Sequence, residues 1–248
     1  MATARLAIRQ IGDPILHTPP PPVDFDQAGR LDEYSAILQN AQCSTGGVGI
    51  ACNQSAAIAA PVAIFWAGTD DEAVREAARL RYPDATLPPA ILMINPEILS
   101  YGAETYFPES GEGCLSVAGP IRGKVRRHRT VRVRYQTQDG MVQERECTGF
   151  EAHIVQHEHD HLRGVVFLQR IFADCSAEQQ SAIARLLQEE AARRQAGGRV
   201  ETGIEPIMVF DRDGESVVFD PTRLAQALGE VPDATLLGMQ SILAVRLR

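Results

Sequence analysis

Apolar residues recur at helical spacing near the start of the chain, where Leu31, Tyr34, Leu38 and Ala41 would share one helix face. This periodicity predicts a helix from about residue 26 to residue 43. Later segments combine helix-forming residues with start or stop signals, such as acidic residues at the start or a glycine at the end. We expect further helices over residues 70–82, 150–163 and 176–194.

Short apolar runs and alternating patterns predict strands between these helices. In Val131–Arg134, valines alternate with arginines, which is typical of a strand with one buried face and one face in water. A hairpin turn follows at Gln138-Asp139-Gly140. The strand that begins at Ile91 is expected to end at Pro96. The expected strands cover residues 61–66, 91–96, 101–107, 131–135, 141–147 and 165–168.

The last part of the chain has a pattern of its own. Apolar runs at 207–210 and 217–219 flank an Asp-Gly turn and predict a hairpin. A short helix is expected from Asp220-Pro221 to Gly229, and residues 243–247 are a candidate final strand. We therefore divide the chain into a main domain, residues 1–198, and a C-terminal β-β-α-β extension, residues 199–248. So small a unit is expected to pack on the main core.

Composition narrows the class of protein. Hydrophobic and charged residues make up 44% and 23% of the chain, which is ordinary for a soluble globular protein. The formal net charge of -8 argues against a DNA or RNA partner held by a broad basic surface. Five unevenly spaced cysteines favour free thiols in a reducing compartment. Because the sequence has no signal-peptide pattern and no bilayer-length apolar stretch, we expect a cytoplasmic protein without a membrane partner.

One short stretch carries the candidate chemistry. His157 and His161 are four residues apart, so on a helix they lie on one face, where two neutral imidazoles can bind one divalent metal ion. Glu158 stands beside them as a candidate acid/base. Gly164 stands where the helix would close on a left-handed residue. The alternative for this stretch alone is a polar surface helix that happens to be rich in histidine.

Two other stretches favour the metal site. Gly47-Val48-Gly49-Ile50-Ala51-Cys52-Asn53-Gln54 comes first in the chain and Glu112-Gly113-Cys114-Leu115-Ser116 second. With the histidine stretch they resemble, in the same order, the three signatures of peptide deformylases: GxGxAAxQ, EGCLS and an HExDHLxG helix. Cys52 is the one departure in the diagnostic letters, where the family usually has alanine. The resemblance covers residues 6–195. It implies an α+β fold with antiparallel or mixed sheets around a central HExxH metal-binding helix.

The resemblance also implies an activity. The chain would be a metal-dependent hydrolase that removes the formyl group from N-formylmethionyl peptides of nascent proteins and releases formate. Cys114 would join His157 and His161 as the third ligand of one divalent ion, with ferrous iron favoured and zinc or nickel as alternatives. Glu158 would take a proton from the attacking water and hand it to the departing amine.

Residues around these ligands are given roles by the same resemblance. The side-chain amide of Gln54 and the backbone N–H of Leu115 would donate to the carbonyl oxygen as negative charge develops on it. Six further residues would bind the substrate. The backbone of Val48, Gly49 and Gly113 is expected to pair with an extended peptide. Phe150 and Ile154 are expected to line a methionine pocket, and Arg122 is expected at the substrate mouth.

Three other features complete the expectations. His153 lies four residues before His157, and one straight helix cannot aim three such side chains at one ion, because they span about 12 Å. We therefore expect His153 in the pocket wall or beside a ligand. Asp160 is expected to pair with an arginine such as Arg127. Residues 68–90 link two strands by a longer segment than the family usually has, so we interpret them as an insertion.

Competing functions stay open at this point. A zinc peptidase shares HExxH but would need a third His or Glu ligand downstream, and Cys114 in its motif argues against it. A deformylase-like module without turnover would be expected to show damaged motif residues, and they are intact. A deformylase acting on another N-formyl amine fits the sequence as well. Ribosome contact through residues 176–194 is not favoured, because the charges there nearly balance.

Overall fold

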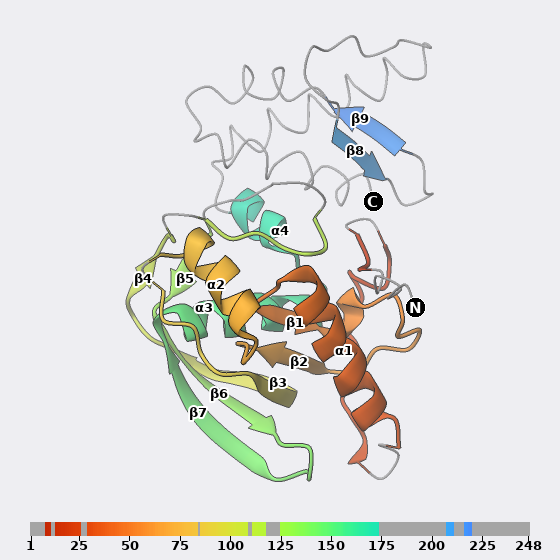
Figure 1. Cartoon of the computed structure of the whole chain (residues 1–248), viewed down its shortest axis with the longest axis vertical. Helices are drawn as coiled ribbons and strands as arrows, with labels where there is room; N and C mark the ends of the chain where they lie inside the picture. Colours follow the sequence, from red (N-terminus) through yellow and green to blue (C-terminus); the bar gives the residue numbers. More distant parts are fainter. Residues whose placement is uncertain are drawn as a thin grey trace.

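The computed structural model of the chain (Figure 1) describes residues 8–10, 13–25, 29–83, 85–108, 111–117, 125–173, 207–210 and 216–219. The elements follow in chain order. They are α1 (Leu31–Thr45), β1 (Gly49–Ala51), the 3-10 turn η2 (Cys52–Gln54), β2 (Ile64–Ala67), α2 (Glu72–Arg81), β3 (Ile91–Tyr101), β4 (Thr105–Tyr106), β5 (Arg127–His128), β6 (Thr130–Gln136), β7 (Val142–Thr148), α3 (Gly149–Leu162), α4 (Phe167–Ala173), β8 (Ile207–Phe210) and β9 (Ser216–Phe219).

A five-stranded antiparallel sheet organises the described part of the chain. Its strand order is β1-β2-β3-β6-β7, so β1 lies at one edge. Two small sheets pair β4 with β5 and β8 with β9. Helices combined with antiparallel sheets confirm the expected α+β class.

Side chains alternate across the sheet, as the two-residue period of a strand requires. In β2, Phe65 and Ala67 belong to the apolar cluster that includes residues of α3, whereas Ile64 and Trp66 belong to the cluster of α1. α3 contacts β1, β2, β6 and β7, and α1 contacts β1 and β2. The sheet is thus packed between two helices, and α3 carries the histidine stretch.

Local signals predicted the main helices well. The four apolar residues that suggested the first helix are buried on α1, and Gly46 closes that helix in the left-handed region at φ 69°. Asp71 caps α2 by accepting from the N–H groups of Ala73 and Val74. Gly164 follows α3 with φ 71°, as predicted. Arg132 and Arg134 are exposed on β6 while its valines are buried.

Two strand predictions are wrong. Val165–Leu168 is not a strand: α4 begins at Phe167, and the N–H of Val166 donates to Oε1 of Gln169 at 2.6 Å. Because the apolar run is so short, its periodicity could not distinguish a buried helix end from a strand. The strand from Ile91 does not end at Pro96 but continues to Tyr101. A register shift between Ile94 and Glu97 accommodates the proline, which has no N–H for the ladder.

The C-terminal predictions are covered only in part. The predicted hairpin is present as β8–β9, with Ile207 opposite Phe219. The helices expected over 176–194 and 221–229, the strand over 243–247 and the boundary at residue 198 lie outside the described residues. Within the part of the chain that the structure describes, no helix combines the length and apolar content needed to cross a membrane.

Candidate active site

Three side chains with metal-binding atoms converge beside the sheet. His157 and His161 lie one turn apart on α3, and Cys114 comes from the loop 111–117. Their ligand atoms all lie within 4.8 Å of one another, and Sγ of Cys114 is 3.2 Å from Nε2 of His161. Within the described residues this is the one His/Cys/Asp/Glu cluster that could hold a metal ion. The structure thus brings together the three predicted ligands.

The donor set fits one divalent ion. A sulfur and a nitrogen bound to a tetrahedral ion at roughly 2.3 and 2.1 Å would lie about 3.6 Å apart, close to the separation found here. A thiolate with two imidazoles suits iron or zinc and leaves one position open. Nearby, Oε2 of Glu158 is buried without a hydrogen-bond partner in the described structure. Such an oxygen fits a site that is completed by another group.

Glu112 orients one of the imidazoles. Its carboxylate accepts a hydrogen bond from Nδ1 of His157 at 2.5 Å, which leaves Nε2 of that ring for a metal. Burial opposes ionisation of Glu112, but Arg127, together with His153 and His157, overrides this and holds the pKa of Glu112 well below its usual range. Glu112 therefore stays a carboxylate. No role was predicted for Glu112 from the sequence, although it opens the EGCLS stretch.

A buried chain of ion pairs supports Glu112. Arg127 binds it through two hydrogen bonds, Nε to Oε1 at 3.0 Å and Nη2 to Oε2 at 3.1 Å. The same guanidinium donates to Oδ2 of Asp160 at 2.7 Å, so the predicted pairing is confirmed. Arg170 of α4 donates to both oxygens of Asp160. Burial raises the pKa of Asp160, but the two arginines outweigh it and the pKa is lowered.

Glu158 lies on α3 beside the two imidazoles. Burial raises its pKa to about 7. The carboxylate packs against β1, where a Cβ atom added to Gly49 would lie 2.4 Å from Oε1 of Glu158. In β1, Ile50 faces the cluster of α1, so its neighbours Gly49 and Ala51 face α3. The missing side chain of Gly49 therefore makes room for Glu158.

Gln54 links the first motif to the second. Its Oε1 accepts from the N–H of Ala51 at 2.8 Å, which fixes the side chain. Its Nε2 donates to Oγ of Ser116 at 3.1 Å and lies 3.5 Å from Sγ of Cys114. The side chain of Leu115 lies over Gly47, where an added Cβ would be 3.0 Å from Cδ1. The amide of Gln54 and the backbone around Leu115 thus both adjoin the metal-binding cluster.

Asn53 ties the same motif to α3. It is fully buried, and its Nδ2 donates to the carbonyl oxygens of His161 at 2.7 Å and Leu16 at 3.2 Å. Arg9 is also buried and donates to the carbonyl oxygens of Asn53, Ser55 and Ile58. Sequence reasoning missed both residues. An amide inside a recognised motif was the available signal for Asn53; Arg9 had none.

The expected substrate-binding residues are found in different situations. The carbonyl oxygen of Val48 accepts a hydrogen bond from the N–H of Gly68, just after β2, at 2.8 Å. Gly113 lies directly between Glu112 and Cys114. Ile154 is buried in the core cluster of α3, and Phe150 packs against that cluster. Arg122 lies outside the described residues.

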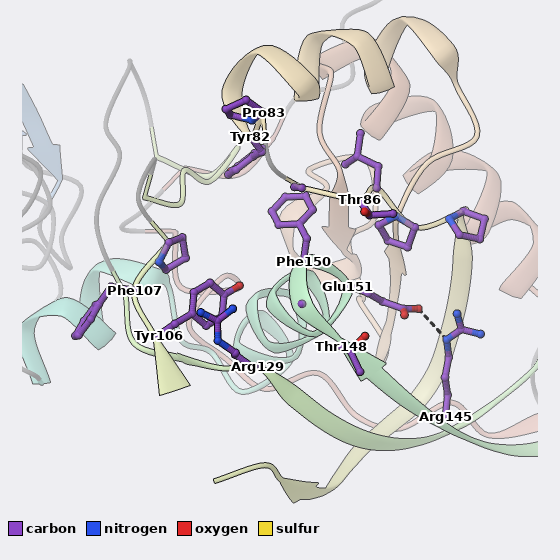
Figure 2. Close-up of a pocket in the computed structure, with 16 residues that line it drawn as sticks. Tyr82, Pro83, Thr86, Tyr106, Phe107, Arg129, Arg145, Thr148, Phe150 and Glu151 are labelled. Atoms are coloured by element: carbon purple, nitrogen blue, oxygen red, sulfur yellow. Dashed lines mark hydrogen bonds and ion pairs between the residues drawn. The ribbon is translucent and has the colours of Figure 1, made fainter. Parts of the chain in front are cut away.

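A pocket of about 740 Å³ opens at the start of α3 (Figure 2). One wall is the loop after α2, which belongs to the expected insertion, and the other comes from the end of β4, from β7 and from the first turn of α3. Phe150 lines this pocket, and its ring contacts those of Tyr82 and His153. His153 in turn places Nε2 3.5 Å from Oε2 of Glu112, the carboxylate that accepts from His157.

Comparisons with known proteins agree with this geometry. The family model for polypeptide deformylase matches residues 5–176. Peptide deformylase 2 of Shewanella oneidensis is 38% identical over 168 residues, 66% of this chain and 83% of the relative. Peptide deformylase 2 of Nostoc sp. is 36% identical over 166 residues, 67% of this chain and 86% of the relative.

The fold is shared with solved structures. The class I type b peptide deformylase from Acinetobacter baumannii, with Met-Ala-Ser bound, is 33% identical with a TM-score of 0.58. That alignment covers 68% of this chain and 99% of the other. The motif geometry, the family match and the shared fold all agree. The chain therefore belongs to the polypeptide deformylase family, metal-dependent hydrolases that remove the N-formyl group from nascent peptides.

Proposed function

We propose that Cys114, His157 and His161 hold the catalytic divalent ion and that Glu158 is the proton carrier of the reaction. The observation that carries this assignment is the convergence of one sulfur and two imidazoles within 4.8 Å beside a buried carboxylate. An ion in that position would supply Lewis-acid activation of water and of the formyl carbonyl. The pKa of Glu158, raised to about 7 by burial, suits a group that first accepts and then donates a proton near neutral pH.

The remaining groups position charge and substrate. Nε2 of Gln54 is held at the rim of the cluster by the bond between its Oε1 and Ala51. From there it can donate to the formyl oxygen, as can the backbone N–H of Leu115. Removing one such donor typically costs about 10²–10³ in rate.

The peptide itself is proposed to lie along the edge strand. β1 is an edge of the sheet, so its outer side can pair with an extended chain. The N–H of Val48, Gly49 and, across the site, Gly113 would make this pairing, while Phe150 and Ile154 would wall the pocket for the first side chain. The Acinetobacter relative, which binds Met-Ala-Ser, supports a peptide that begins with methionine.

Ferrous iron is the proposed native metal, with zinc or nickel as substitutes. Zinc usually binds such a site more tightly than ferrous iron, so occupancy in the cell depends on supply as well as affinity. Because nascent chains are the proposed substrate, the proposed location is the cytoplasm. Arg122 is proposed at the substrate mouth on the family resemblance alone.

One experiment tests the metal and the substrate together. Protein purified without oxygen is analysed for metal, and formate release is measured with formyl-Met-Ala-Ser and with free formylmethionine. We expect ferrous iron and a strong preference for the peptide. Cys114→Ser should lose metal, because a neutral hard oxygen replaces a soft thiolate. Normal iron content and turnover in that variant would remove Cys114 from the ligand set, and a preference for the non-peptide substrate would indicate a different N-formyl compound.

Residues 199–248 are proposed as an extension that seals the main domain or forms an oligomer contact. The family match ends at residue 176, which supports a boundary beyond it.

We also propose that residues 176–194 do not dock on ribosomes, since their charges nearly balance. Salt-sensitive co-sedimentation with ribosomes, lost on replacing Arg193 and Arg194, would contradict this. A chain ending at Gly198 with unchanged stability and oligomeric state would contradict the role of the extension.

A further inference from the structure

The loop after α2 is held firmly in place. Arg75 of that helix donates to the carbonyl oxygens of Leu87 and Pro88, at 3.2 and 3.3 Å. The N–H of Thr69 donates to the carbonyl of Pro88 at 3.2 Å. The loop also begins on a fixed residue, because the N–H of Tyr82 donates to the carbonyl of Ala78 as the helix ends. A side chain on this loop can therefore fix the position of a side chain that packs against it.

Tyr82 meets the first turn of α3 (Figure 2). Its ring centroid lies 4.5 Å from that of Phe150, with the planes tilted by 45°. The rings of Phe150 and His153 lie 5.4 Å apart. Phe150 thus contacts two rings, one at the end of α2 and one on its own helix. Both distances are typical of aromatic pairs that contribute beyond their buried area.

The space around Phe150 is large enough to receive its ring. The pocket of about 740 Å³ is lined on this side by Tyr82, Leu87 and Tyr106. Its two cations already have partners: Nε of Arg129 lies 2.6 Å from Glu104, and Nε of Arg145 lies 2.7 Å from Glu151. Because those charges are paired, the pocket favours an uncharged aromatic group over an anion.

Phe150 also faces the proposed site for the first residue of the substrate. It precedes His157 by seven residues, about 10.5 Å along the helix axis, and Ile154 lies between them. A side chain that enters beside the metal cluster and runs along this helix face would end against Phe150. Phe150 is also one of the residues that line the pocket of about 740 Å³.

We propose that Tyr82 is a specificity-determining residue. By packing on Phe150 it fixes the end wall of the first-residue pocket and keeps the larger cavity closed to the substrate. The enzyme then prefers an unbranched side chain of methionine length. Without the Tyr82 ring, Phe150 moves into the cavity and the pocket accepts a large aromatic first residue. This inference depends on the proposed role of Phe150 in the substrate pocket.

The test compares two substrates, formyl-Met-Ala-Ser and formyl-Trp-Ala-Ser. In Tyr82→Ala, kcat/KM for the tryptophan peptide relative to the methionine peptide is expected to rise about 2- to 12-fold, the range that one aromatic pair allows. Tyr82→Leu keeps an apolar contact for the loop and should shift the ratio in the same direction. It serves as the test variant if Tyr82→Ala is unstable. Tyr82→Phe keeps the ring and should keep the parent ratio. Leu80→Ala, on the same helix but exposed, is the matched control.

Either of two kinetic results would overturn the proposal: a parent-like ratio in the folded Ala and Leu variants, or an equal shift in Tyr82→Phe. A crystal structure of Tyr82→Ala adds a readout that needs no turnover. In that variant the Phe150 ring is expected to move away from the His153 ring and into the cavity. A Phe150 ring in the parental position would contradict the proposal. A parent protein that releases no formate from formyl-Met-Ala-Ser would contradict the proposed function, whatever the ring position shows.

Discussion

A methyl group on Gly49 would lie 2.4 Å from Oε1 of Glu158 and 2.9 Å from its Cδ. Real Cβ atoms do not approach other atoms so closely, so any larger residue at position 49 must displace the carboxylate. The contact follows from the fold: the strand period turns Gly49 toward α3, and α3 carries Glu158 one residue after His157. Gly49 of the first motif and Glu158 of the third, far apart in the sequence, therefore pack directly against each other.

Gly49→Ala should inactivate the enzyme without removing its metal. The added methyl group pushes Glu158 from its place, and loss of a positioned proton carrier typically costs about 10²–10⁴ in rate. The ligand atoms are not touched by the change. Formate release and metal content, measured on the same preparation, check this. Gly29→Ala is the control, because an added Cβ there meets nothing within 4 Å. Full activity of Gly49→Ala would mean that the carboxylate position is unimportant.

Glu158→Gln should keep the metal and lose nearly all formate release. The amide fills the same space beside Gly49 but cannot accept the proton of the attacking water. The ligands Cys114, His157 and His161 are unchanged, so metal content should equal that of the parent. Activity within a few-fold of the parent would remove Glu158 from its proposed role.

Activity should fall on the acid side of neutral pH. Glu158 must be ionised to accept a proton, and burial raises its pKa to about 7. Below the pKa the carboxyl is protonated, so kcat/KM declines as the pH drops through it. A nearby cation favours the ionised form, and the acid limb in the metal-loaded enzyme should therefore lie below about 7. The pH profile of kcat/KM measures it, and an acid limb unchanged in the residual activity of Glu158→Gln would assign the limb to another group.

Local spacing was enough to predict part of the site. The four-residue interval of His157 and His161, and a glycine at 164, define one face and the end of a helix wherever that helix packs. The family resemblance added Cys114, and the structure brings its sulfur to within 3.2 Å of His161. The resemblance was needed for that step because the loop 111–117 carries no periodic signal.

The contacts of Glu112 could not be predicted from the sequence. Glu112 meets His157 across 44 intervening positions and Arg127 across 14, with no periodic signal to link them. An arginine is exposed or buried according to what packs over it in the fold, and its neighbours in the sequence do not reveal this. Gly49 was expected to bind the peptide through its backbone. In the structure, the absence of a side chain at Gly49 also makes room for the carboxylate of Glu158.

Arg127→Met should destabilise the fold far more than the loss of an exposed arginine. Arg127 is 3% exposed and pairs with Glu112 and Asp160, so its removal leaves the buried Glu112 without an arginine and Asp160 with Arg170 alone. Breaking such a buried pair typically costs about 3–5 kcal/mol. Arg134→Met is the control, because its partners Glu97 and Glu144 are at the surface, where a pair contributes about 0–1 kcal/mol.

The deficit of Arg127→Met should also depend on pH. In the parent, Arg127 lowers the pKa of Glu112 and Asp160 against the effect of burial. Groups with depressed pKa values add stability above their unfolded-state pKa and lose it as the pH falls through the folded-state pKa. The difference between parent and variant should therefore be largest at neutral pH and shrink in acid, where the carboxyls of the variant are protonated. Urea unfolding of the metal-free proteins measures this without a contribution from the ion. A deficit below about 1 kcal/mol at neutral pH, matching Arg134→Met, would show that the carboxylates do not depend on Arg127.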